Sequence, residues 1–139
     1  MVKVIMGLKG SGKTKQLIEL VQACVRERHG DVVVIEKDRK LIHELPHAVR
    51  LIEADDYGIG AYPDYDFLKG FLSGLYAANY DITHIFIDRL LRIVKRDVDA
   101  KLEEFLDWCE SFSERMNVKF TITISADTAL ATEGIHKYF

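Results

Sequence analysis

The chain has 139 residues, of which 48% are hydrophobic and 29% are charged. These proportions are ordinary for a globular domain, so they exclude a disordered chain, a collagen-like repeat and a disulfide scaffold. The 19 basic and 22 acidic residues give a net charge of −3, which offers no global argument for nucleic-acid binding. No uncharged apolar run of about 18 residues predicts a membrane span, and no secretory leader is recognisable. We therefore expect residues 1–139 to form one domain of a cytoplasmic protein.

The charge is distributed unevenly along the chain. Residues 1–50 hold 10 basic and 6 acidic side chains, a net of +4, whereas residues 51–88 hold 1 and 7, a net of −6. Residues 89–139 hold 8 and 9, a net of −1. A basic first third is suited to phosphate binding, and ordinary surface variation is the alternative interpretation.

The first part of the chain predicts a strand, a glycine-rich loop and a helix. Residues 2–6 are mostly apolar and β-branched, which is typical of a short strand. Three glycines punctuate residues 7–12 and predict a loop. From Lys13 to about Arg28 apolar residues recur at spacings of three and four, which predicts an amphipathic helix.

The central part predicts strands, a loop and further helix. The uninterrupted apolar run at 32–35 is typical of a strand buried on both faces. We expect a short helix at about 38–45 and a short strand at 48–52. Gly, Pro and Asp dominate residues 53–66, which predicts a loop. Residues 67–76 then repeat apolar side chains at helical spacing.

The last part continues the alternation of strands and helices. A strand is predicted at 85–87, a helix at about 97–116 and a strand at 118–125, with a short helix in the tail at 127–139. Strands that alternate with helices imply a parallel sheet with helices on both faces. The predicted fold class is therefore α/β, with three layers and a parallel sheet of four or five strands.

A phosphate-binding motif stands between the first predicted strand and helix. Residues Gly7-Leu8-Lys9-Gly10-Ser11-Gly12-Lys13-Thr14 match the pattern G-x-x-x-x-G-K-[ST] at every specified position. Glycines let backbone N–H groups turn inward around phosphate oxygens, and the following helix adds the positive end of its dipole. Lys13 would place an ammonium group on the β- and γ-phosphates, and the Thr14 hydroxyl would bind Mg²⁺. All eight residues are therefore candidates for nucleotide binding.

In this position, residues 7–14 resemble the P-loop NTPase superfamily. The resemblance implies a second element, an apolar strand that ends in Asp, and Ile85-Phe86-Ile87-Asp88 fits that description. Asp88 would then hold Mg²⁺ together with Thr14, and the implied cofactors are ATP or ADP and Mg²⁺. Of the strand orders found in the superfamily, we expect the RecA-like order rather than the kinase-like order.

Four features together resemble a narrower group, the short stand-alone P-loop ATP-binding proteins of bacteria. These features are the loop at 7–14, the Val/Ile strand with its acidic and basic cluster at 32–39, the strand at 85–88 and the Ser-Ala-Asp at 125–127. Such proteins are loosely labelled by likeness to the ATPases of twitching motility. Membership of this group would imply ATP binding.

Glu36 is the candidate for positioning an attacking water. Many P-loop ATPases with an extra strand between the two motifs carry Glu directly after the Asp of the second motif, but here that residue is Arg89. In the RecA-like branch the catalytic Glu can end the second strand instead, where this chain has Glu36. We therefore predict a catalytic set of Lys13, Glu36 and Asp88. The alternative is that Glu36 is an ordinary residue of a loop.

Two polar residues near the end of the last predicted strand are candidates for contact with the γ-phosphate. Ser125 stands at the end of that strand and is the first choice, and Thr123 is the second. Ordinary strand-end hydrogen bonding is an equal alternative for both.

A basic run follows the second motif. If this run is helical, Arg89, Arg92 and Arg96 fall on one face, at spacings of three and four. Three uses are open: an arginine supplied to a neighbouring subunit, a polyphosphate or nucleic-acid contact, and a solvated face of salt bridges. The nearby Asp97 and Asp99 favour the last of these.

Taken together, these residues predict a Mg-ATP-binding protein that hydrolyses ATP slowly. A nucleotide-dependent protein-interaction module without useful turnover is an alternative, because position 89 is not Glu. A small-molecule phosphotransferase is a weaker alternative, because the loop at 53–66 has no Arg or Lys to close over a phosphate. A protein partner or a homo-oligomer is compatible with each, and nucleic acid is not favoured as a partner.

Overall fold

A computed structural model describes residues 1–27, 30–38 and 40–139. Arg28, the expected last residue of the first helix, and Arg39, in the basic and acidic cluster after the second strand, lie outside the described residues. The strands are β1 (Val2–Gly7), β2 (Asp31–Glu36), β3 (Arg50–Glu53), β4 (Ile82–Ile87) and β5 (Lys119–Ser125). The helices are α1 (Lys13–Glu27), α2 (Tyr65–Ala78), α3 (Leu90–Val94), α4 (Ala100–Met116) and α5 (Glu133–His136), with 3₁₀ turns η1 (Ala54–Tyr57) and η2 (Thr128–Leu130).

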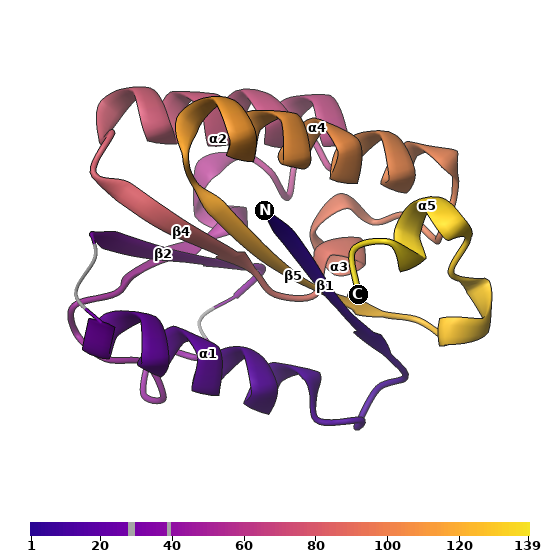
Figure 1. The fold of residues 1–139 in the computed structure, drawn as a ribbon, viewed down its shortest axis with the longest axis horizontal. Helices are drawn as coiled ribbons and strands as arrows, with labels where there is room; N and C mark the ends of the chain where they lie inside the picture. Colours follow the sequence, from indigo (N-terminus) through magenta and orange to yellow (C-terminus); the bar gives the residue numbers. More distant parts are fainter. Residues whose placement is uncertain (28–29, 39) are drawn as a thin grey trace.

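The five strands form one parallel sheet in the order β1-β5-β4-β2-β3 (Figure 1). The last strand, β5, lies between β1, which leads into the glycine-rich loop, and β4, which ends at Asp88. This intervening strand is the feature that separates the RecA-like order from the kinase-like one. The predicted fold class and strand order are therefore confirmed.

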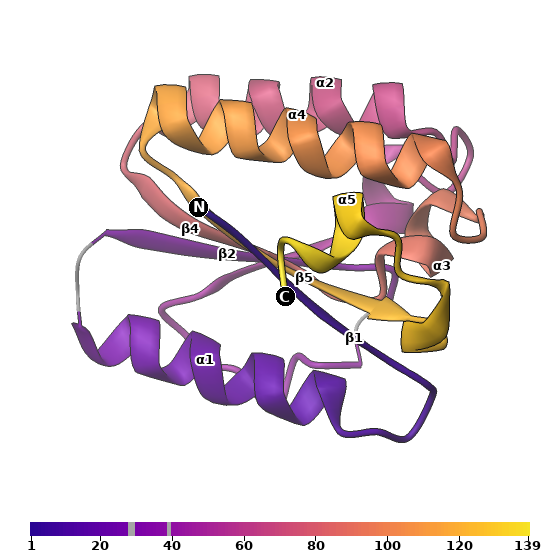
Figure 2. The same cartoon turned by 45° about the vertical axis from the view of Figure 1, so that its right-hand side comes forward.

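Helices cover both faces of the sheet, with α1 on one face and α2 and α4 on the other (Figure 2). Successive residues of the central strands point to opposite faces. In β2, Val33 and Ile35 join the core under α2 and α4, whereas Val32 and Val34 join the core under α1. This two-sided burial explains why residues 32–35 are apolar without interruption. The parallel pairing of β2 with β4 places Glu36 and Asp88 at the carboxyl ends of neighbouring strands.

The segment expected to be a helix at 38–45 instead forms turns among its described residues. Both carboxylate oxygens of Glu36 accept hydrogen bonds from its backbone, from Lys40 N at 2.6 Å and Leu41 N at 3.2 Å. Such side-chain bonds give the backbone an alternative to helical bonding, and Pro46 follows directly. The prediction of a helix here was therefore wrong.

The basic run after Asp88 is helical for only five residues, because α3 ends at Val94. Lys95 has a left-handed backbone with φ +54°, which terminates the helix. Arg96 therefore lies outside α3, and the expected common helical face for Arg89, Arg92 and Arg96 does not form. The expected tail helix is likewise reduced to η2 and α5. Within the described residues, no helix combines the length and apolar character needed to cross a bilayer.

Candidate functional site

The glycine-rich loop follows β1 and leads directly into α1, and its glycines have specific structural roles. Gly10 and Gly12 adopt positive φ values of +84° and +85°, which other residues rarely tolerate. A Cβ atom at Gly7 would lie 2.6 Å from Ser11 Oγ. Backbone conformation thus explains Gly10 and Gly12, and the close approach of the Ser11 side chain explains Gly7.

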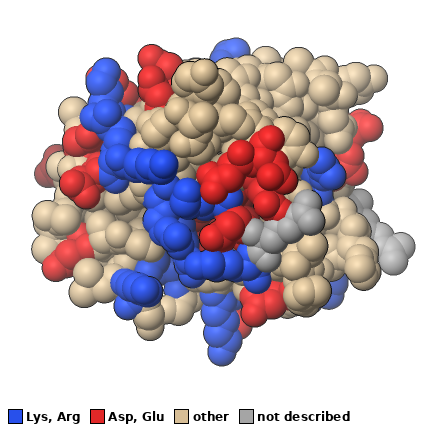
Figure 3. All heavy atoms as spheres, turned by 180° about the vertical axis from the view of Figure 1, so that it is seen from behind, with Lys and Arg blue, Asp and Glu red and all other residues tan. Residues whose placement is uncertain are grey.

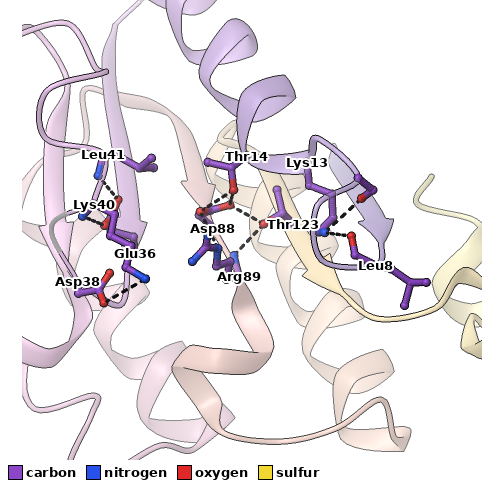
Figure 4. Close-up of polar contacts among 11 residues, drawn as sticks. Leu8, Lys13, Thr14, Glu36, Asp38, Lys40, Leu41, Asp88, Arg89 and Thr123 are labelled. Atoms are coloured by element: carbon purple, nitrogen blue, oxygen red, sulfur yellow. Dashed lines mark hydrogen bonds and ion pairs between the residues drawn. The ribbon is translucent and has the colours of Figure 1, made fainter.

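Lys13 is buried beneath this loop, with 7% of its surface exposed. Its ammonium donates hydrogen bonds to the Leu8 carbonyl at 2.8 Å and to Ser11 Oγ at 3.3 Å (Figure 4). Burial lowers the pKa of Lys13, and the nearby charge of Arg89 lowers it further, although Asp88 acts in the opposite direction. The loop thus holds a largely desolvated cation at the start of α1.

Asp88 is the buried carboxylate of the site, with 3% of its surface exposed. The Thr14 hydroxyl lies 3.4 and 3.3 Å from its two carboxylate oxygens, and the Thr123 hydroxyl donates to Oδ1 at 2.7 Å. Figure 4 shows Asp88 between these two threonines, which come from α1 and β5. The Asp88 N–H also donates to the Ile35 carbonyl at 2.9 Å. These contacts orient the carboxylate toward the start of α1.

Arg89 turns the chain sharply after Asp88. Its backbone is left-handed, with φ +53°, and its N–H donates to Thr123 Oγ1 at 2.7 Å. Its Nε lies 3.8 Å from Asp88 Oδ2. The residue that occupies the position of the expected Glu therefore places a guanidinium beside the buried carboxylate.

Glu36 lies at the end of β2, beside the strand that ends at Asp88, and only 4% of its surface is exposed. Its carboxylate is turned into the following segment by the bonds from Lys40 N and Leu41 N (Figure 4). Burial raises the pKa of Glu36 to about 7, outweighing these bonds, and the charges of Asp88 and Asp38 contribute to the increase. A carboxyl group near neutrality can exchange protons at physiological pH.

A cavity of about 610 Å³ lies at the carboxyl end of the sheet. We call it the loop cavity, and it is lined by Lys9, Gly10, Gly12, Lys13, Thr14, Lys15, Lys40, Arg89, Arg92 and Ser125. Six of these residues are basic, and no acidic residue is among the described lining residues. Figure 3 shows Lys and Arg side chains gathered in a band on one face, beside a cluster of acidic side chains. The loop cavity is therefore electrostatically suited to a multiply charged anion.

The two residues predicted to contact the γ-phosphate, Ser125 and Thr123, occupy different environments. Ser125 lines the loop cavity, whereas Thr123 is fully buried and bonds to Asp88 and Arg89. Sequence reasoning did not identify Lys15 and Lys40 as lining residues. Lys15 directly follows the motif, in the first turn of the predicted helix, so its position beside the loop cavity could have been predicted. Lys40 reaches the loop cavity through a turn that no local pattern indicated. Among the described residues, no group of three His, Cys, Asp or Glu side chains could hold a metal ion.

The sheet order, the loop between β1 and α1 and the Asp at the end of β4 define the fold of the RecA-like P-loop NTPases. The chain resembles the flagellar accessory protein FlaH from Methanocaldococcus jannaschii, with a TM-score of 0.53 and 16% identity over 98% of this chain and 65% of FlaH. It thus spans about two thirds of that protein. A second solved structure, the pCW3 conjugation coupling protein TcpA with ATPγS, matches with a TM-score of 0.48 and 16% identity over 99% of this chain and 46% of TcpA.

No protein-family model matches the sequence, and a search of curated proteins finds no match. The similarity to FlaH is a similarity of fold.

Proposed function

We propose that residues 1–139 form one nucleotide-binding domain that binds Mg-ATP and hydrolyses it slowly. The observation that carries this function is the approach of Thr14 Oγ1 to both carboxylate oxygens of Asp88, at 3.4 and 3.3 Å, next to the loop that buries Lys13. A hydroxyl and a carboxylate are oxygen ligands of the kind that Mg²⁺ prefers.

The residues present fit a magnesium nucleotide. The loop cavity has room for a triphosphate and six cations to neutralise it, and the inward-turned loop supplies backbone N–H donors. Bound Mg²⁺ would neutralise charge that develops on the β- and γ-phosphates. Lys13 would exchange its present bonds to Leu8 and Ser11 for phosphate oxygens, and Ser125 would contact the phosphate farthest from the base. Thr123 would act indirectly, by orienting Asp88.

Glu36 is proposed to position the attacking water. A cleft of about 20 Å³, enough for roughly one water molecule, is lined by Glu36 and Asp88 together with Arg89 and Arg92 and their neighbours. The pKa of Glu36, about 7, suits a group that accepts a proton near neutrality. The hydrogen bonds from Lys40 N and Leu41 N restrict the Glu36 carboxylate and compete with the water for its oxygens. This competition is consistent with slow turnover.

A second candidate function is a nucleotide-dependent interaction module without useful turnover. Two observations favour it: Arg89 occupies the position after Asp88, and both Glu36 oxygens are already hydrogen-bonded. The two functions share nucleotide binding and differ in hydrolysis. ATP consumption by the purified protein in water, absent from a Glu36→Gln variant, would support the ATPase. Turnover that requires an added acceptor would instead indicate a phosphotransferase.

The first test is a thermal-shift titration with ATP, ADP and GTP, with and without Mg²⁺. A ligand at 100 times its dissociation constant should add about 2.7 kcal/mol to the free energy of unfolding, which corresponds to a shift of several degrees. Lys13→Ala should abolish the shift. Lys101→Ala removes the same charge from an exposed position of α4, outside the loop cavity, and should retain the shift. A chain that no nucleotide stabilises would contradict the proposed function.

A further inference from the structure

A second basic cavity adjoins the loop cavity on the side of α3. This α3 cavity, about 340 Å³, is lined by Arg89, Leu91, Arg92, Lys95, Arg96, Asp97 and Ser125. Four of the seven lining residues are cations and one is acidic. Arg89, Arg92 and Ser125 line both cavities, so the two spaces share a wall. The α3 cavity therefore borders the place where the far end of a bound triphosphate would lie.

Two of these four cations have a backbone conformation that is unfavourable for residues other than glycine. Arg89 and Lys95, directly before and after α3, both adopt left-handed conformations, with φ of +53° and +54°. Glycine is the residue that favours such positions, yet the chain has a long cationic side chain at each. Strained residues of this kind cluster where a protein binds or reacts. The two positions thus point to a role for their side chains.

The cations of the α3 cavity are only partly neutralised. Arg89 lies 3.8 Å from Asp88, Arg96 pairs with Asp99 at 2.7 Å, and Lys95 donates a hydrogen bond to the Gly60 carbonyl at 3.4 Å. In the part of the chain that the structure describes, no carboxylate pairs with Arg92. A guanidinium has five N–H donors in a planar fork, so even the paired Arg96 retains donors for a second anion.

From these observations we infer that the α3 cavity binds the phosphomonoester group of a second ligand, distinct from the nucleotide. Guanidinium groups recognise phosphate oxygens in pairs, and a phosphomonoester brings close to two negative charges at neutral pH. The cavity volume is suited to a small phosphorylated molecule. A long polyanion is disfavoured, because the carboxylate of Asp97 lines the cavity and that of Asp99 pairs with Arg96 at its edge.

The test uses inorganic phosphate as the probe and equilibrium dialysis as the readout. The loop cavity is first filled with a non-hydrolysable ATP analogue and Mg²⁺, so that added phosphate reports on the α3 cavity. We expect one phosphate per chain. Arg92→Gln with Lys95→Gln should weaken its binding about tenfold or more, as expected for the loss of charge-assisted hydrogen bonds. Lys95→Gln alone, which changes only the α3 cavity, should weaken it in the same direction.

The matched control is Arg115→Gln with Lys119→Gln, which removes two charges near the amino end of β5. This control should bind phosphate as the unmodified protein does, and equal losses in both double variants would overturn the site. A Lys13→Ala variant without nucleotide should still bind phosphate at the α3 cavity, so a failure of the proposed function is separable from a failure here. Binding of (dT)20 that exceeds phosphate binding and depends on Arg92 and Lys95 would overturn the small-ligand assignment.

Discussion

Thr123 connects Asp88 to the backbone turn that follows it. The buried Thr123 hydroxyl donates to Asp88 Oδ1 and accepts from Arg89 N–H, both at 2.7 Å. One side chain from β5 thus orients the carboxylate proposed to bind Mg²⁺ and satisfies the N–H of a left-handed residue. The relationship couples the geometry of the site to the packing of β5 against β4.

Thr123→Val keeps the shape of this side chain and removes its hydroxyl. The buried Arg89 N–H loses its acceptor and Asp88 loses a donor, so we expect the free energy of unfolding to fall by about 1–3 kcal/mol. Mg²⁺-dependent stabilisation by ATP should also weaken. Thr123→Ser retains the hydroxyl and is the control. A valine variant with unchanged stability and unchanged Mg²⁺ dependence would show that this bond does not support the site.

Glu36→Gln should alter how stability depends on pH. The folded-state pKa of about 7 lies above the ordinary value of 4.5, so between these pH values the folded chain holds a proton that the unfolded chain releases. The free energy of unfolding therefore falls as pH rises through this range, by roughly 3 kcal/mol in full. The glutamine variant lacks this contribution. The difference in free energy of unfolding, variant minus unmodified protein, should therefore be more positive at pH 8 than at pH 4.5. Urea unfolding at several pH values measures this, and parallel curves would contradict it.

Gly10→Ala and Gly7→Ala should disturb the loop for different reasons. At Gly10 nothing lies within 4 Å of an added Cβ, so the cost of about 1 kcal/mol comes from its positive φ. At Gly7 the φ is ordinary, but the new Cβ would meet Ser11 Oγ at 2.6 Å. A Ser11→Gly change should therefore rescue Gly7→Ala and leave Gly10→Ala unimproved. Thermal unfolding of the single and double variants distinguishes these cases.

Arg89→Gly and Arg89→Ala form a pair that separates backbone strain from side-chain charge. Both remove the guanidinium beside Asp88, so both should weaken nucleotide-dependent stabilisation to a similar degree. Only glycine accepts the left-handed backbone without penalty, so the glycine variant should be more stable than the alanine variant by about 1 kcal/mol. Denaturant unfolding of the two apo proteins gives the difference. An alanine variant at least as stable as the glycine variant would show that Arg89 is not strained.

Local patterns in the sequence were sufficient for the elements that carry the site. The G-x-x-x-x-G-K-[ST] spacing of residues 7–14 predicted a loop between a strand and a helix. The apolar run at 32–35 predicted a strand buried on both faces, and the run at 85–87 predicted a strand that ends at Asp88. These predictions succeeded because glycine conformation and apolar periodicity are properties of a few adjacent residues. The alternation of strands and helices was likewise enough to predict the parallel sheet.

Only the tertiary structure decided which side chains meet at that sheet edge. Thr123 reaches Asp88 because β5 lies between β1 and β4, and that order depends on contacts between residues far apart in the chain. Glu36 bonds to the backbone that follows it, so the segment at 38–45 turns where its composition suggested a helix. The left-handed Lys95 ends α3, and four cations from this segment line one cavity. The sequence by itself thus determined the fold class and the loop, and long-range packing determined the direction of each functional side chain.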